Sequence, residues 1–337
     1  MRWVAGLALV FAISGSACAQ EKPLQEGPSV HETQNTIKVA QNGSAVFHCE
    51  TIINSPEDFK RCKDAEGAFN QKNPQIGGVG DISASLNCVG VIEQGGAVLC
   101  KTRPNTKVKV ARSEKDFYFE SADENGQIII GFDRDETKSF VEAVGDRVSF
   151  DLKPREYDTS RIDGLPPSQV STFSEAQLKR IRSSSARKKT GFASRAEEMG
   201  FKDGFDLPIK ADFIKTTNFG AQRILNGEPK KPHYGVDLAA PVGTPIYAPA
   251  DGVVSLADDD LYFEGAMVLL DHGQGLISMY LHTDEILVEP GQTVKQGEQI
   301  ATVGSKGRST GPHLCWRLKW RNRNLDPLLL TEWPQNG

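Results

Sequence analysis

The stretch HYGVDLAAPVGTPIYAPADG, residues 233–252, decides the fold of the C-terminal part of this chain. Its short apolar segments are separated by proline and glycine, which favour turns over long helices. The same alternation continues downstream, where the apolar segments Met267–Leu270 and Ile277–Tyr280 lie between further turns. Short strands broken at this spacing predict a β domain over residues 207–334.

An H-x-x-x-D motif opens this stretch, and an H-x-C motif follows near the end of the chain. They are formed by His233 with Asp237 and by His313 with Cys315. In a strand, residues i and i+2 point to the same face, so His313 and Cys315 can address one site. Imidazole, carboxylate and thiolate all bind zinc, and three protein ligands with one open position are typical of a catalytic zinc site. The spacing alone is weak evidence, because such motifs also arise by chance.

Further motifs accompany these two, and together they resemble the lysostaphin/LytM family of zinc metallopeptidases. The resemblance implies a compact antiparallel β domain with one zinc ion in a groove. It also implies hydrolysis of the cross-links or stem peptides of peptidoglycan. The motifs that carry it are Asn218-Phe219-Gly220, Arg223–Gly227, His233–Pro245, Asp271-His272-Gly273, Tyr280-Leu281-His282 and Gly304–Leu314.

The resemblance assigns the metal ligands by position. His233 and Asp237 correspond to two zinc ligands of the family. The third family ligand is the second histidine of an H-x-H motif, and Cys315 stands in its place. Either the Cys315 thiolate replaces the imidazole as a ligand, with a weaker Lewis acid as the result, or the site is degenerate. A third alternative is that Cys315 is a buried apolar residue and no metal binds.

Roles for four further residues follow from the same resemblance. His313 is expected to act as general base, and His282 is expected to stabilise the oxyanion of the tetrahedral intermediate. Asn218 and Arg223 are expected near the groove, in supporting or in packing roles.

The N-terminus has the pattern of a secretory signal peptide over residues 1–19. A short basic start precedes an apolar run that is too brief to span a bilayer, and Ala17-Cys18-Ala19 fits a cleavage site. The alternative is a lipoprotein signal, in which Cys18 is acylated. We therefore expect an exported protein, with the periplasm as its compartment. A net charge of −5 gives no support for a nucleic-acid partner.

The N-terminal half carries four further cysteines, which in an oxidising compartment can form two disulfides. The simplest pairing is Cys49–Cys62 and Cys88–Cys100, although four cysteines allow three pairings. Residues 20–74 are polar and are expected to be poorly structured apart from a disulfide. Short alternating segments over 75–153 predict a small antiparallel β-sandwich, which we interpret as a binding or spacer module.

A linker with a basic helix is expected over residues 154–206. The helix is predicted from Ser174 to Met199, because Ser174 is a good N-cap and a carboxylate follows it. Its basic side chains either rest on an anionic wall polymer or lipid surface, or form a solvated face.

The sequence thus predicts a mainly β, exported zinc endopeptidase that hydrolyses peptidoglycan cross-links. The stretch Arg223–Asp237 most resembles Gram-negative proteins, so D-alanyl–diaminopimelate cross-links are the preferred substrate. The alternative is a weak or inactive factor that binds peptidoglycan and regulates a cell-wall amidase. The N-terminal module is a further candidate for docking a divisome partner.

Overall fold

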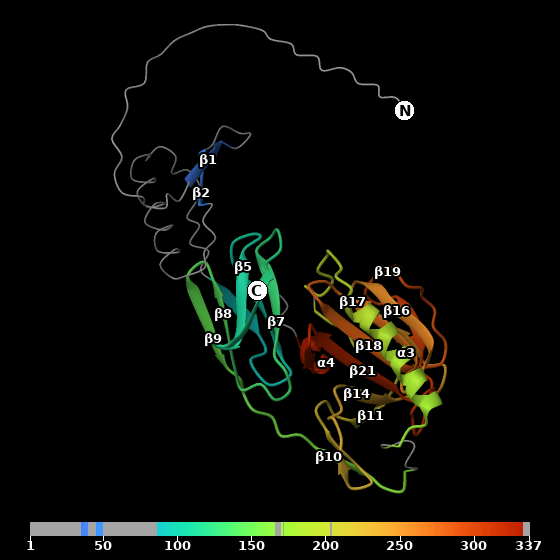
Figure 1. Ribbon diagram of the computed structural model, residues 1–337. Helices are drawn as coiled ribbons and strands as arrows, with labels where there is room; N and C mark the ends of the chain where they lie inside the picture. Colours follow the sequence, from blue (N-terminus) through green and yellow to red (C-terminus); the bar gives the residue numbers. More distant parts are fainter. Residues whose placement is uncertain are drawn as a thin grey trace, which may run out of the picture. The chain divides into compact units, whose positions relative to one another are not determined.

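The computed structural model describes residues 35–39, 45–49, 86–165, 170, 172–202 and 204–332. The chain divides into two compact units, Met1–Asp81 and Ile82–Gly337 (Figure 1). In the first unit, β1 (Asn35–Val39) and β2 (Ala45–Cys49) form an antiparallel pair. The expected signal peptide and the expected Cys49–Cys62 disulfide lie outside the residues whose side chains are described. No helix in the described part of the chain has the length and apolar composition needed to cross a membrane.

The second unit begins with two antiparallel sheets, which confirms the β-sandwich-like architecture. One sheet has the order β3-β4-β7, and the other has the order β6-β5-β8-β9. The expected disulfide between Cys88 and Cys100 joins β3 to β4. Sequence analysis did not single out β3 or β8. The strands are β3 (Asn87–Gly90), β4 (Ala97–Lys101), β5 (Lys107–Ser113), β6 (Asp116–Ser121), β7 (Gln127–Gly131), β8 (Lys138–Ala143) and β9 (Asp146–Asp151).

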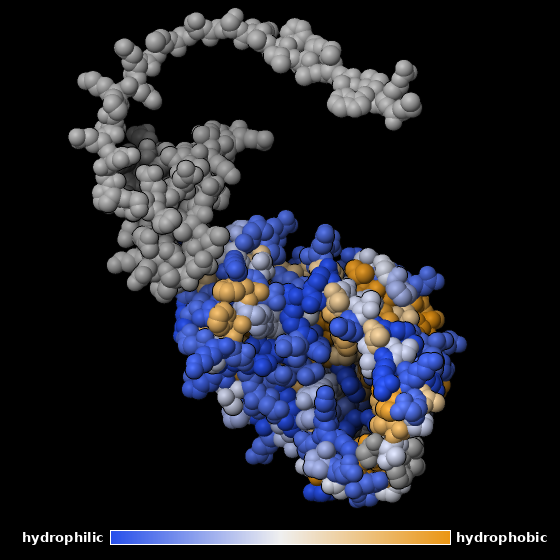
Figure 2. All heavy atoms as spheres, in the orientation of Figure 1, coloured by the Kyte–Doolittle hydropathy of each residue, from blue (hydrophilic) through white to orange (hydrophobic). Residues whose placement is uncertain are grey.

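The sandwich packs against the C-terminal domain within the same unit. Strand β7 is buried on both faces, which explains its continuous apolar run Ile128-Ile129-Ile130. The buried Arg323 donates from Nη1 to the carbonyl of Gly131, at 2.9 Å. Figure 2 shows a mostly hydrophilic visible face on this unit, with small separated apolar patches. The large apolar side chains therefore serve mainly the internal packing.

The C-terminal domain is built around one antiparallel sheet, as predicted for the fold class. Its strand order is β11-β14-β21-β18-β17-β16-β19, and β22 pairs with β21. Strands β17 and β18 are buried along their whole length, so both faces of the sheet are covered. The strands are β11 (Ile214–Thr217), β14 (Val236–Ala239), β16 (Gly252–Leu261), β17 (Gly265–Asp271), β18 (Leu276–Thr283), β19 (Thr293–Val294), β21 (Leu314–Trp320) and β22 (Arg323–Leu325).

Smaller elements surround this sheet. Strand β10 comes from the linker and pairs in parallel with β12, and β13 continues that small sheet. Strands β15 and β20 pair separately, and α4 closes the domain. These elements are β10 (Thr159–Ile162), β12 (Gln222–Leu225), β13 (Glu228–Pro229), β15 (Pro245–Tyr247), β20 (Gln299–Thr302) and α4 (Pro327–Thr331).

Helix α3 (Glu175–Phe192) lies over strand β16 (Figure 1). It starts where the sequence predicted, with a capping box between Ser174 and Gln177. It ends at Phe192, seven residues before the predicted Met199. Beyond the helix, the backbone N–H of Ala196 donates to Asp271 Oδ2 at 2.7 Å. This contact directs the chain toward the end of β17 and away from the helix axis. The local sequence pattern that predicts a helix contains no information on such a long-range contact.

Three of the six basic residues of α3 pair with the hairpin between β16 and β17. Arg187 contacts Asp258 at 2.5 Å, and Lys188 forms an ion pair with Glu264. Near the other end of the helix, Arg180 contacts Asp260 at 2.7 Å. The other three, Lys179, Arg182 and Lys189, are exposed, so only part of the helix remains as a solvated basic face. Arg180, Arg187 and Lys188 have a structural role. They fasten the helix to the hairpin that borders the candidate site.

His272 is a buried structural residue. Its Nδ1–H donates to the carbonyl of Asp251 at 2.7 Å, so its Nε2 accepts from the Ser278 hydroxyl, at 2.7 Å. This arrangement holds the ring neutral, and burial lowers its pKa to about 4.

We expect His272 to make the fold sensitive to acid. Its folded-state pKa lies below the unfolded value of 6.5, so its contribution is present above pH 6.5 and is lost as pH falls toward 4. The free energy of unfolding from urea titrations should lose about 2–3 kcal/mol from this residue between about pH 7 and about pH 4.5. The variant His272→Gln should show a flatter pH dependence than the wild type. Identical slopes for the two proteins would contradict this assignment.

Candidate metal centre

Three side chains of metal-ligating type meet in the C-terminal domain, namely His233, Asp237 and Cys315. Their ligand atoms all lie within 4.8 Å of one another, and all three residues are buried. His233 Nε2 lies 3.1 Å from Asp237 Oδ1 and 3.1 Å from Cys315 Sγ. Antiparallel pairing of β14 with β21 places Asp237 directly opposite Cys315. The structure therefore brings together the three residues that sequence analysis proposed as ligands.

The chemistry of this cluster fits a zinc ion. On the side of the cluster where the ligand atoms meet, Asp237 Oδ1 is buried and has no hydrogen-bond partner of suitable geometry within the described part of the chain. Such orphaned polar atoms are costly unless a ligand satisfies them. Donor atoms around tetrahedral zinc lie about 3.5 Å apart. The 3.1 Å separations therefore need to widen by only a few tenths of an ångström.

His313 borders this cluster and is oriented by its own loop. Its Nδ1–H donates to the carbonyl of Gly311 at 2.8 Å, which leaves the lone pair on Nε2. Nε2 lies 3.8 Å from Asp237 Oδ1. A histidine whose Nε2 faces the ligand cluster has the geometry that a general base requires.

His282 lies beside His313, with a distance of 4.9 Å between the ring centroids. Its backbone has a positive φ of 64°, a conformation that non-glycine residues adopt rarely and often at functional sites. Its backbone N–H donates to the carbonyl of Glu264 at 3.1 Å, and its Nδ1–H donates to the carbonyl of Lys306 at 2.8 Å. Burial lowers its pKa to about 4. His282 is therefore neutral near pH 7 and also presents a lone pair on Nε2.

The electrostatics of the ligands follow from burial and from nearby charges. Burial raises the pKa of the Cys315 thiol to about 12, although the nearby Arg317 opposes this shift. Burial alone would raise the pKa of Asp237, but contacts with His233 and the charges of His233 and His313 hold it well below its usual range. In the metal-free protein the thiol is thus protonated and the carboxylate is ionised. A metal ion must displace the thiol proton to bind.

Arg317 is a site residue that sequence analysis missed. It lies two residues after Cys315 on the same face of β21, and its Nε donates to Cys315 Sγ at 3.2 Å. The i, i+2 rule that paired His313 with Cys315 could have identified it. Arg223 is half-buried on β12, and its charge interacts with Arg317, Asp237 and Cys315.

Asn218 does not contact the ligand cluster in the described contacts. Its side chain is exposed, and its Nδ2 donates to Asp158 Oδ2 of the linker at 2.8 Å. The structure therefore gives Asn218 a contact that fastens the linker to the domain.

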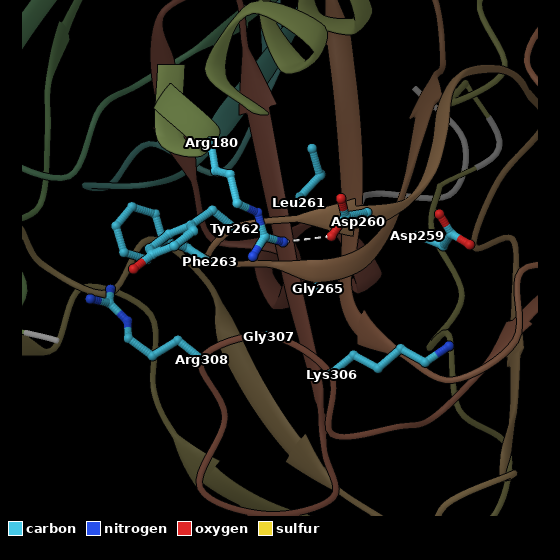
Figure 3. A pocket seen from close by; sticks show the side chains of 10 residues that line it. All are labelled: Arg180, Asp259, Asp260, Leu261, Tyr262, Phe263, Gly265, Lys306, Gly307 and Arg308. Atoms are coloured by element: carbon cyan, nitrogen blue, oxygen red, sulfur yellow. Dashed lines mark hydrogen bonds and ion pairs between the residues drawn. The ribbon is translucent and has the colours of Figure 1, made fainter. Parts of the chain in front are cut away.

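A pocket of about 400 Å³ opens in the C-terminal domain (Figure 3). It lies between α3, the β16–β17 hairpin and the segment 306–308, which includes the carbonyl that accepts from His282. Arg180 and Asp260 form an ion pair at its wall (Figure 3). It does not include the three candidate ligands. The lining residues are Arg180, Asp259, Asp260, Leu261, Tyr262, Phe263, Gly265, Lys306, Gly307 and Arg308.

Comparisons with known proteins identify relatives of the C-terminal domain. Residues 231–327 match the sequence profile of peptidase family M23. The chain is 38% identical over 123 residues to the peptidoglycan DD-endopeptidase ShyA of Vibrio cholerae, covering 36% of this chain and 28% of that protein. It is 31% identical over 135 residues to the cell division protein DipM of Caulobacter vibrioides, covering 38% of this chain and 21% of that protein. The chain thus spans less than a third of the length of either relative.

The fold also has a counterpart among solved structures. The crystal structure of a Pseudomonas aeruginosa protein assigned to peptidase M23 superposes with a TM-score of 0.51, at 24% identity. The match covers 71% of this chain and 95% of that one. At this level of identity the likeness concerns the fold alone.

Proposed function

Since its C-terminal domain belongs to the lysostaphin/LytM-type peptidase family M23, we propose that this protein is an exported zinc endopeptidase. Its substrate is the peptide cross-link of peptidoglycan, and it acts in the periplasm with one zinc ion per chain. The observation that carries the proposal is the buried cluster of His233, Asp237 and Cys315, with two histidines beside it.

His233 Nε2, the Asp237 carboxylate and the Cys315 thiolate would hold the ion. A bound zinc ion supplies Lewis acidity and lowers the pKa of water toward ~7. His313 accepts the proton of the attacking water at Nε2, since its Nδ1–H is fixed on Gly311. It then returns this proton to the leaving amine.

His282 has a more restricted role than the family resemblance implies. Its Nδ1–H is directed to the carbonyl of Lys306, so neutral His282 has no proton on Nε2 for an oxyanion. It can stabilise an oxyanion only after it gains a second proton. We infer that His282 and His313 share a proton during turnover, because their rings are neighbours.

Digestion of purified sacculi tests the proposal. The zinc-loaded, full-length protein should convert cross-linked muropeptide dimers into monomers, and chelation should abolish the conversion. The two kinds of muropeptide are separated and quantified by chromatography. His233→Ala is the matched control, because it removes one ligand and should leave the dimers intact.

The alternative of an amidase regulator predicts a different result in the same assay. It is favoured by the thiolate, since a thiolate donates more charge to zinc than an imidazole does and so weakens Lewis acidity. The relative DipM is described as a cell division protein. Binding to sacculi without loss of dimers, together with stimulation of an added cell-wall amidase, would replace the peptidase proposal with this one.

A further inference from the structure

Arg317 lies beside the candidate metal site and has most of its donors free. Its Nε donates to Cys315 Sγ at 3.2 Å. Its side chain passes over Gly235, where a Cβ atom would lie 2.4 Å from Arg317 Cγ. Among the described residues it forms no ion pair with a carboxylate, and its terminal nitrogens have no hydrogen-bond partner. The position of the guanidinium is therefore fixed, while its two terminal nitrogens remain available.

Arg223 adds a second positive charge that interacts electrostatically with the ligand cluster. It is half-buried, and the described contacts include no hydrogen bond or ion pair of its side chain. Burial lowers its pKa, and the positive charge of Arg317 lowers it further, while Asp237 and Cys315 raise it. Both guanidinium groups thus act on the ligand cluster and repel each other.

This arrangement differs from that of Arg155 and Arg323, which have carboxylate partners. Arg155 pairs with Asp326 at 2.8 Å, and Arg323 pairs with Glu136 at 3.4 Å. A buried charge is costly unless an opposite charge compensates it. At the candidate site, the Asp237 carboxylate and the Cys315 thiolate would balance the two charges of zinc. The charges of Arg317 and Arg223 are then not compensated by an anionic side chain among the described residues.

We propose that Arg317 and Arg223 bind a free carboxylate of the substrate, on the residue whose amino group is released by cleavage. This inference rests on the proposed function, and it specifies which kind of peptide bond is cleaved at the candidate metal centre. D-alanyl–diaminopimelate cross-links and D-alanyl–D-alanine termini both carry a free carboxylate on that residue. The internal bonds of glycine bridges and of ordinary L-peptides do not, because the next carboxyl group is part of an amide.

The distances support this placement. The carboxylate carbon of that residue is separated from the scissile carbonyl carbon by one nitrogen and one Cα, or about 3–4 Å. Arg317 contacts a metal ligand directly, so its guanidinium lies within one residue of the reacting carbon. The planar fork of a guanidinium suits a carboxylate, because two parallel N–H groups can donate to its two oxygens.

Binding of two matched stem peptides tests the inference without turnover. One pentapeptide ends in D-alanyl–D-alanine with a free carboxylate, and the other has the same sequence with a terminal amide. Calorimetric titration of the chelated, full-length protein excludes hydrolysis. We expect the wild type to bind the acid about 10- to 100-fold more tightly than the amide. Arg317→Gln and Arg223→Gln should each reduce this ratio to below about threefold, and Arg317→Lys should retain part of it.

The control is Arg321→Gln, which removes an arginine that pairs with Glu120 on the sandwich. It should leave the ratio of acid to amide binding unchanged. Equal binding of the two peptides by the wild type would overturn the inference, whatever the activity on sacculi. A clear preference for the acid in a protein that cuts no cross-link would support the carboxylate site and refute the peptidase proposal.

Discussion

Replacement of Cys315 by alanine should lower the zinc content from about one ion per chain to less than about a tenth of an ion. The reason is that only His233 and Asp237 would remain as protein ligands, and two donors do not hold zinc against dialysis. Metal analysis of the purified, zinc-replete protein after dialysis measures the effect. His233→Ala should give the same loss.

Cys315→His is the informative counterpart, because it keeps three donors and should retain the metal. The pH dependence of zinc affinity should distinguish the wild-type site from the site of the Cys315→His variant. Zinc must displace the thiol proton of Cys315, whose pKa is about 12, so affinity should rise about tenfold per pH unit near neutrality. The histidine variant should lose most of this dependence above about pH 7, because a histidine side chain is then already neutral. A full zinc content in Cys315→Ala would show that the thiolate is not a ligand.

Replacement of His313 by alanine should reduce kcat/KM for cross-link cleavage by about 100- to 10,000-fold, which is the usual contribution of a general base. Zinc content should remain near that of the wild type, because His313 is not among the three ligands. Rates on a soluble cross-linked muropeptide, with the metal content of each sample, give the result. A loss below about tenfold with the metal retained would assign the base to another residue, of which His282 is the nearest candidate.

The sequence was sufficient to predict the ligand cluster because its members lie on or directly before two neighbouring strands. Antiparallel pairing of β14 with β21 places Asp237 opposite Cys315, while His313 directly precedes β21. Six histidines are spread over the chain, so the spacing needed support from the family motifs. The mainly β fold was predictable for the same reason, since turn residues mark the ends of most strands.

Features that depend on contacts between distant segments were not predictable. The partners of the α3 cations lie more than 70 positions away, as in the pairs of Arg187 with Asp258 and Lys188 with Glu264. The end of α3 depends on the contact of Ala196 with Asp271. Arg317 was missed because an arginine after a metal-ligand motif resembles an ordinary strand residue until its contact with Cys315 is seen.

The position of α3 also bears on how much of the chain can fold by itself. Phe192 packs against a buried cluster that contains Leu269 and Cys315, and Lys319 of β21 lies 5.1 Å from the centre of the Phe192 ring. A Cβ atom on Gly191 would lie 2.8 Å from Leu269, so helix and sheet are in close contact. A fragment that starts at residue 207 would expose this apolar face of the sheet to water and would be prone to aggregate. The segment defined by family likeness, residues 231–327, therefore lacks the helix that covers this face of the sheet.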